Sequence, residues 1–202
     1  MAPPPPTVIV IAGVSGSGKT TIGSLLAERL GWDYAEADSF HSEANIEKMR
    51  SGHPLTDADR LPWLRAIAAW IDDRLATDRP PAPTHRQSTD ELRSTGRPGV
   101  VTCSALKRRY RDIVAGGRPG VRMVLLDGDH DLIAARMRAR EGHYFGADLL
   151  DTQFADLEPP APDEDVLTVP ITGPPEDTVT HLMTVLGLTP SPPGGPWPQS
   201  RT

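Results

Sequence analysis

Short apolar runs alternate with helical patterns along most of this chain. Residues 7–12 form a β-branched run of the kind found in buried parallel strands. Apolar side chains then recur at Ile22, Leu25, Leu26 and Leu30, which is the spacing of a helix. The same patterns predict further strands at 32–37, 100–103, 121–126 and 166–169 and further helices at 42–50, 61–75, 106–114, 131–140, 148–157 and 176–186.

The alternation of strands and helices indicates the fold class. Strands that are joined by helices pair in parallel, and right-handed crossovers place the helices on both faces of the sheet. We therefore expect a three-layer α/β/α fold around a five-stranded parallel sheet. Ligands of such folds bind at the carboxyl ends of the strands, so polar residues directly after a strand are the first candidates for a site.

Three stretches fall outside this pattern. Residues 1–6 and 188–202 are rich in proline, and we expect both to be disordered. Residues 78–98 have little apolar periodicity and are expected to form a surface loop that is inserted into the domain. The folded domain should then span residues 7–187.

The segment after the first predicted strand is a phosphate-binding loop. Residues 13–20 read Gly-Val-Ser-Gly-Ser-Gly-Lys-Thr and match the pattern G-x-x-x-x-G-K-[ST]. The glycines let successive backbone N–H groups point at an anion, Lys19 adds a mobile positive charge, and Thr20 offers a hydroxyl to Mg²⁺. The loop therefore predicts a nucleoside triphosphate and Mg²⁺ as ligands. The residues expected to bind them are Gly13, Ser15, Gly16, Ser17, Gly18, Lys19, Thr20 and Thr21.

The composition disfavours some classes of binding partner. The formal net charge of −6 disfavours nonspecific binding to nucleic acid. We expect a cytoplasmic protein without a membrane partner, because no apolar run reaches the length of a membrane span and no secretion signal is present. Cys103 is the only cysteine, so no internal disulfide can form. Lysine is rare beside arginine, which favours Lys48 and Lys107, along with Lys19, as site residues that need a compact ammonium group.

Two polar residues follow the second predicted strand. Asp38 and His41 should lie near the γ-phosphate of the bound nucleotide, because that strand ends at the same edge of the sheet as the phosphate loop. A carboxylate there can accept a proton from an attacking hydroxyl, or position Mg²⁺ through a bound water molecule. The alternatives are that Asp38 only caps the next turn and that His41 is a packing residue.

Basic residues stand where helices are predicted to begin. Arg60 precedes the helix at 61–75, where a cation opposes the helix dipole unless an anionic or polyol partner compensates. Lys107 and Arg111 are four residues apart and share a helix face, so they can hold one carboxylate or phosphate together. The alternative for this segment is a basic surface patch.

A second arginine pair lies at the end of the helix at 131–140. Arg136 and Arg140 are four residues apart, and glycines follow them. They predict a mobile lid over about residues 136–147, whose arginines close over the phosphates and exclude water. The alternative is that both arginines only complement the helix dipole.

Taken together, these segments resemble the thermoresistant-type gluconokinases, which are relatives of shikimate and nucleoside monophosphate kinases. The resemblance covers roughly residues 7–187. It implies a P-loop kinase fold with a lid, Mg²⁺-dependent transfer of phosphate from ATP to the 6-hydroxyl of D-gluconate, and a homodimer. It is carried by the phosphate loop, Asp38 with Phe40 and His41, and the segments 45–49, 57–64, 103–107, 110–112, 142–145 and 152–154.

The resemblance also implies roles for single residues of this chain. Glu36 stands where members of the family often have Asp, which keeps the charge. The positions that match the family are Lys19, Thr20, Asp38, Lys48, Arg60, Lys107 and Arg111. With the lid arginines added, we assign catalytic roles to Lys19, Asp38 and Arg136, contacts with the nucleotide to Arg136 and Arg140, and contacts with the acceptor to Asp38, His41, Lys48, Arg60, Lys107, Arg111 and His143.

Two other functions remain open from the sequence. A kinase for another small acceptor, such as shikimate or a nucleoside monophosphate, would need the same phosphate loop. A nucleotide switch without transferase activity would need it as well. Because Asn45 is the only asparagine, the chain has no Asn-Lys-x-Asp motif for reading guanine, which argues against a GTPase switch.

Overall fold

A five-stranded parallel sheet forms the centre of the computed structural model, which describes residues 5–76, 97–139 and 147–192. All the pairings are parallel and the strand order is β2-β3-β1-β4-β5. The predicted sheet and fold class are therefore confirmed. The strands are β1 (Val8–Ala12), β2 (Asp33–Glu36), β3 (Gly99–Thr102), β4 (Val121–Asp127) and β5 (Val166–Pro170).

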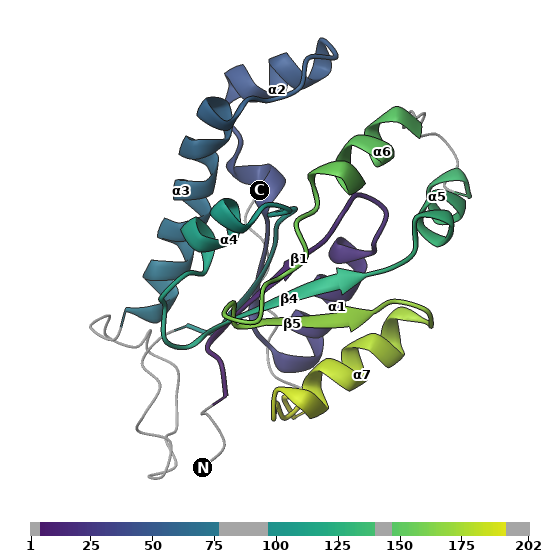
Figure 1. Cartoon of the computed structure of the whole chain (residues 1–202). Coiled ribbons are helices and arrows are strands. Elements are labelled where there is room, and N and C mark those ends of the chain that lie inside the picture. The colour runs from purple at the N-terminus through teal and green to yellow at the C-terminus, as the bar shows by residue number, and fades with distance from the viewer. Residues whose placement is uncertain (1–4, 77–96, 140–146, 193–202) are drawn as a thin grey trace.

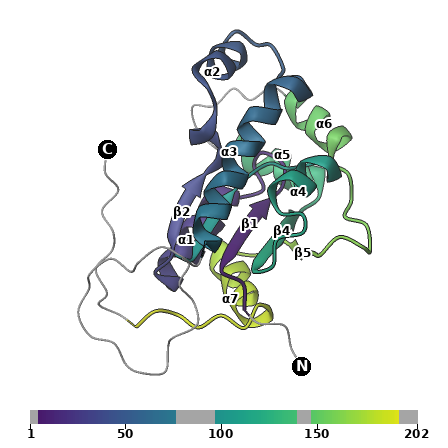
Figure 2. The ribbon, with the colours of Figure 1, turned by 90° about the vertical axis from the view of Figure 1, so that its left-hand side faces the viewer.

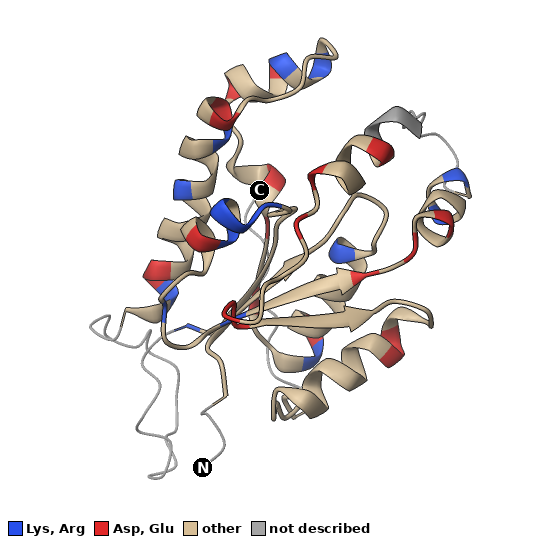
Figure 3. Ribbon diagram, in the orientation of Figure 1, with Lys and Arg blue, Asp and Glu red and all other residues tan. Residues whose placement is uncertain are grey.

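Helices cover both faces of the sheet (Figure 1, and from the side in Figure 2). Successive side chains of β1 point to opposite faces, so Ile9 and Ile11 enter one core cluster while Val8 and Val10 enter the other. Figure 3 shows β1 without charged residues along its length and charges on the surrounding helices, as burial on both faces requires. The first cluster packs against α1 (Lys19–Leu30) and α7 (Pro175–Val185), and the second against α3 (Asp57–Leu75) and α4 (Arg108–Val114).

The remaining helices lie beyond the carboxyl ends of the strands, around the loop that follows β1 (Figure 1). The short 3-10 helix η1 directly follows β2. This end of the molecule is where a parallel α/β fold binds its ligands. The elements are η1 (Ala37–Phe40), α2 (Glu43–Arg50), α5 (His130–Arg138) and α6 (Ala147–Asp156).

Helix α3 begins four residues earlier than the sequence analysis predicted. The predicted start rested on Pro62, which is tolerated in a first turn, but Pro62 lies inside the observed helix. A capping box starts the helix instead. The Thr56 side chain accepts a hydrogen bond from the Asp59 N–H at 3.3 Å, and the Asp59 carboxylate accepts one from the Thr56 N–H at 2.7 Å. The backbone N–H groups of Thr56 and Asp59 thereby both have a hydrogen-bond partner. Arg60 lies in the first turn of the helix rather than before it.

The ordered chain also continues past residue 187, where the tail was predicted to begin. Leu188 packs against the core, and Ser191 donates hydrogen bonds from its N–H to Arg29 O at 2.9 Å and from its hydroxyl to Leu30 O at 2.6 Å. Residues 188–192 are therefore part of the domain, and the prediction was wrong for them. Residues 1–4 and 193–202, and all but the last two residues of the predicted loop at 78–98, lie outside the described residues. None of the helices described is both long and apolar enough to span a bilayer.

Candidate active site

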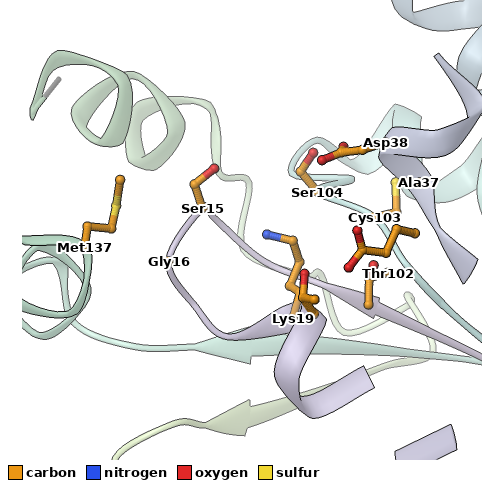
Figure 4. A pocket seen from close by; sticks show the side chains of 11 residues that line it. Ser15, Gly16, Lys19, Ala37, Asp38, Thr102, Cys103, Ser104 and Met137 are labelled. Carbon is orange, nitrogen blue, oxygen red and sulfur yellow. The ribbon is translucent and has the colours of Figure 1, made fainter. Parts of the chain in front are cut away.

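A cavity of about 220 Å³ opens at the carboxyl ends of the strands (Figure 4). The loops after β1, β2 and β3 form most of it, together with the first turn of α1 and one residue of α5. It brings together three residues that the sequence analysis assigned to chemistry, namely Lys19, Thr20 and Asp38. The lining residues are Ser15, Gly16, Lys19, Thr20, Glu36, Ala37, Asp38, Thr102, Cys103, Ser104 and Met137.

The phosphate loop has the backbone shape that binding an anion requires. Gly13, Gly16 and Gly18 have positive φ values of 147°, 79° and 90°, a region that side chains disfavour. Gly18 is the N-cap of α1, so the loop leads directly into a helix N-terminus with its free N–H groups. The Ser17 hydroxyl is buried and has no hydrogen-bond partner among the described residues. An unsatisfied buried hydroxyl inside this loop fits a site that is completed by a ligand.

Close packing against α5 also requires that position 16 has no side chain. A Cβ atom at this position would lie 2.6 Å from Met137 Cγ and 3.0 Å from Ile133 Cγ2. The crest of the phosphate loop is therefore in contact with α5, and any side chain there would push the helix away.

Lys19 and Asp38 approach the cavity from different elements. Lys19 extends from the start of α1, and its ammonium donates a hydrogen bond to Val14 O at 2.9 Å. Asp38 comes from η1 and lies with Ser104 on the side of the cavity away from Met137 (Figure 4). The space between them is bounded by a cation on one side and a carboxylate on the other, which is the arrangement that phosphoryl transfer to a hydroxyl requires.

Glu36, Thr102 and Ser104 also line the cavity, although the sequence analysis did not assign them to the site. Glu36 and Thr102 end the neighbouring strands β2 and β3 and are paired in register. The signal was present, because both residues stand at the carboxyl ends of predicted strands. Glu36 accepts a hydrogen bond from the Tyr34 hydroxyl at 3.0 Å. Burial raises the pKa of Tyr34 to about 12, so this hydroxyl remains a donor at neutral pH.

Cys103 lies at the base of the cavity as a buried thiol. Burial raises its pKa to about 12, an effect that Lys19 and Arg60 only partly offset. The thiol therefore stays protonated at neutral pH and is a poor nucleophile.

His41 follows η1, outside the lining of the cavity. Its ring stacks on Trp63 with a centroid distance of 4.6 Å and an angle of 6°, and the Trp63 indole N–H donates to Ala37 O at 2.6 Å. Burial lowers the pKa of His41, while the nearby Asp38 raises it and Arg60 lowers it further. The Nδ1 atom is buried without a hydrogen-bond partner among the described residues. The ring is therefore a neutral imidazole held by packing, with one nitrogen left for a ligand.

Lys48 and Arg60 lie near the start of α3 and do not line the cavity. Lys48 pairs with Asp59 at 2.6 Å, and this hydrogen bond, together with those from Thr56, holds the pKa of the Asp59 carboxyl well below its usual range. The Arg60 Nε donates to Leu55 O at 3.3 Å, and its guanidinium lies 5.8 Å from the centre of the Tyr110 ring. The structure therefore places both cations around the capping box, on the η1 side of the site.

Arg111 requires a correction. Its side chain is 2% exposed, and it forms a two-pronged ion pair with Glu164 at 2.7 and 2.9 Å. Its Nη1 atom donates to Leu106 O and Glu158 O at 2.9 and 3.0 Å. With four of its five N–H donors engaged and no access to the cavity, Arg111 is a structural residue, and the prediction that it binds the acceptor was wrong.

Lys107 does not share a ligand with Arg111 as predicted. It is the N-cap of α4, and its ammonium pairs with Asp156 at 2.8 Å, which raises the pKa of Lys107. It is 21% exposed, so it remains accessible near the end of α6.

Arg136 lies on the other side of the phosphate loop. It lines a second cavity of about 320 Å³ together with Gly16, Ser17, Gly18 and Thr21. Its Nη2 atom donates to Ile171 O, after β5, at 2.7 Å. The two cavities share Gly16 in their linings, and Asp38 lines only the first while Arg136 lines only the second. Arg140, His143 and most of the predicted lid lie outside the described residues.

The fold and this site define a class of protein. A parallel sheet in the order found here, with a complete phosphate loop after β1 and a carboxylate after β2, is the arrangement of a P-loop kinase of small molecules. The family model described as shikimate kinase matches residues 15–57, which include most of the phosphate loop and Asp38.

Comparisons over the whole chain identify the family. The chain is 42% identical to a gluconokinase of Gluconobacter oxydans, covering 81% of this chain and 82% of that protein. It is 38% identical to the thermoresistant gluconokinase of Escherichia coli, covering 89% and 93%. The crystal structure of a gluconokinase from Sinorhizobium meliloti matches with a TM-score of 0.74 and 36% identity, covering 91% and 93%. The chain belongs to the gluconokinase family, and it is an ATP-dependent kinase that acts on an alcohol group.

Proposed function

We propose that this chain transfers the γ-phosphoryl group of ATP to the 6-hydroxyl of D-gluconate, giving 6-phospho-D-gluconate and ADP. One observation carries the proposal: Lys19, Thr20 and Asp38 line the same cavity, in a chain that is related over most of its length to gluconokinases. A phosphate-binding loop supplies the donor side, and the carboxylate supplies the acceptor side.

ATP fits the chemistry of the phosphate loop. The free N–H groups at the start of α1, the buried Ser17 hydroxyl and the Lys19 ammonium are donors for the phosphate oxygens. The second cavity, which shares Gly16 with the first and is lined by Arg136 and Thr21, has room for the rest of the nucleotide. Arg136 and Arg140 are assigned to its phosphates as part of this proposal.

Mg²⁺ belongs to the same proposal. In kinase sites this ion is held by substrate phosphates, by water and by one or two protein oxygens, and it neutralises charge on the transferring group. Thr20 is exposed at the cavity and offers a hydroxyl, while the carboxylates of Asp38 and Glu36 lie in the same lining and can bind through water. This donor set fits Mg²⁺, which prefers oxygen ligands.

Asp38 is assigned to the acceptor hydroxyl. It accepts the proton, or holds the hydroxyl in line with the phosphoryl group, while Lys19 follows the charge of that group. Gluconate is a polyol with one carboxylate. We assign its binding to Arg60, Lys48, Lys107 and the free nitrogen of His41, with His143 added by the resemblance alone.

The lid at about 136–147, the homodimer and the cytoplasmic location remain parts of this proposal. They rest on the sequence patterns and on the family resemblance described above.

A panel of acceptors tests the proposed function. Release of ADP from ATP and Mg²⁺ is followed with D-gluconate, shikimate and nucleoside monophosphates in turn, and without any acceptor. The proposal predicts rapid ADP release only with gluconate. Release with another acceptor would move the protein to a different kinase specificity, and slow hydrolysis that no acceptor accelerates would favour a nucleotide switch.

A further inference from the structure

Gln153 of α6 contacts the phosphate loop through two hydrogen bonds. The Ser15 N–H donates to Gln153 Oε1 at 2.6 Å, and Gln153 Nε2 donates to Ser15 Oγ at 3.0 Å. Because a backbone N–H can only donate, the oxygen of the carboxamide must face it, which fixes the orientation of the side chain. Figure 1 shows α6 beside the loop that follows β1. The proposed function gives this contact no role.

The peptide unit that Gln153 holds is also the one that Lys19 contacts. The N–H of Ser15 and the carbonyl of Val14 belong to the same planar trans peptide, so they point in opposite directions. Gln153 binds the N–H on one side, and the Lys19 ammonium binds Val14 O at 2.9 Å on the other. A rotation of this peptide that moved the carbonyl away from Lys19 would have to break the hydrogen bond to Gln153.

We propose that Gln153 is a positioning residue for phosphoryl transfer. It holds the Val14–Ser15 peptide so that the carbonyl faces Lys19, and the lysine ammonium is thereby kept over the cavity that Asp38 also lines. This inference rests on the proposed function, because it concerns the reaction that Lys19 serves. Small misplacements of a catalytic group reduce the rate much more than they reduce binding.

Helix α6, which carries Gln153, is in contact with α5. His130 at the start of α5 contacts Asp151 of α6 at 2.7 Å, and its ring lies 5.0 Å from that of Phe154. Met137 of α5 packs on Gly16, so the crest of the loop is contacted by α5 at Gly16 and by α6 at Ser15. Gln153 therefore acts from a supported helix, as a positioning residue should.

Three variants test the inference. Gln153→Met keeps the length and packing of the side chain but removes both hydrogen bonds. Gln153→Glu keeps an acceptor for the Ser15 N–H and adds a negative charge near the phosphates. Ala155→Ser is the matched control on the same helix, because Ala155 is exposed and its replacement leaves both Gln153 and the contact between His130 and Asp151 in place. For each variant kcat, the KM values for ATP and gluconate, and the melting temperature are measured.

The inference predicts that Gln153→Met lowers kcat by about tenfold or more, with the KM for gluconate and the melting temperature close to those of the wild type. Gln153→Glu should recover part of kcat while its added charge raises the KM for ATP. Ala155→Ser should keep the wild-type kcat.

Two results would overturn the inference. One is a Gln153→Met enzyme with the wild-type kcat; if its KM for ATP were also lower, Gln153 would only compete with a phosphate oxygen. The other is equal kcat values for Gln153→Met and Gln153→Glu. A wild-type protein that does not phosphorylate gluconate would instead refute the proposed function, so the two failures are distinguishable.

Discussion

Single arginines and lysines of this chain show that a charge acquires a role only through its partners. Arg111 matched the family pattern, yet it lies in the core and is bound by Glu164 and two backbone carbonyls. The sequence could not reveal this, because Glu164 lies 53 residues away and is brought close only by the fold. Lys19 and Asp38, in contrast, were predictable because each follows a strand at the same edge of the sheet.

Replacing Asp38 with Asn tests its role in the transfer. The amide keeps the shape of the side chain but cannot accept a proton, so kcat should fall by roughly 10²- to 10⁴-fold. The affinity for ADP should change little, because the phosphate loop is untouched. Steady-state kinetics and calorimetric titration with ADP measure the two quantities. A variant that retains the wild-type kcat would remove Asp38 from the mechanism.

The half-buried imidazole of His41 should make stability depend on pH. Burial holds its pKa in the folded state below the ordinary value of 6.5, so the unfolded chain takes up the proton first as the pH falls. The contribution is therefore present above about pH 6.5 and is lost as the pH falls through the lower pKa of the folded state. Urea unfolding of the wild type and of His41→Phe, which keeps an aromatic ring on Trp63, measures this contribution. The wild type should lose more stability than the variant between neutral pH and about pH 5, and parallel curves would contradict the explanation.

Most secondary elements were predictable because their apolar spacing follows from burial on the two faces of the sheet. The boundaries that differed were set by polar contacts rather than by spacing. Helix α3 begins at its capping box, where Asp59 serves both the Thr56 N–H and Lys48. The C-terminal segment is held by hydrogen bonds from Ser191 to the end of α1. Its proline-rich composition gave no sign of these contacts.

The ion pair between Arg111 and Glu164 should be a major support of α4. Glu164→Ala leaves a buried guanidinium without a countercharge, which should lower the free energy of unfolding by about 3–5 kcal/mol. Asp163→Ala is the matched control, because its pair with Arg108 is exposed to solvent and should contribute little to stability. Chemical denaturation measures both losses. Similar losses for the two variants would contradict the structural role given to Arg111.

At the scale of the whole molecule, the site is assembled from two groups of segments at the carboxyl ends of the strands. In the proposed function, the loop after β1 and the start of α1 bind the phosphate donor, and the segments after β2 and β3 bind the acceptor. Residues from all of these segments line one cavity. The donor side could be predicted from the eight residues of the phosphate loop alone. The acceptor side was predictable only in part. Asp38 follows a predicted strand, but the pairing that brings Glu36 and Thr102 together at the cavity depends on the register of β2 and β3. The contact between Gln153 and Ser15, 138 residues apart, also depends on the complete fold.

Phosphorylation of the primary hydroxyl of gluconate can be read from the structure of the product. The protein is incubated with ATP, Mg²⁺ and D-gluconate, and the proton-coupled ³¹P spectrum of the product is recorded. An ester at C6 has two methylene protons next to its oxygen, so its phosphorus signal should be split into a triplet. A doublet, which indicates an ester at a secondary carbon, or the absence of any gluconate ester would contradict the account.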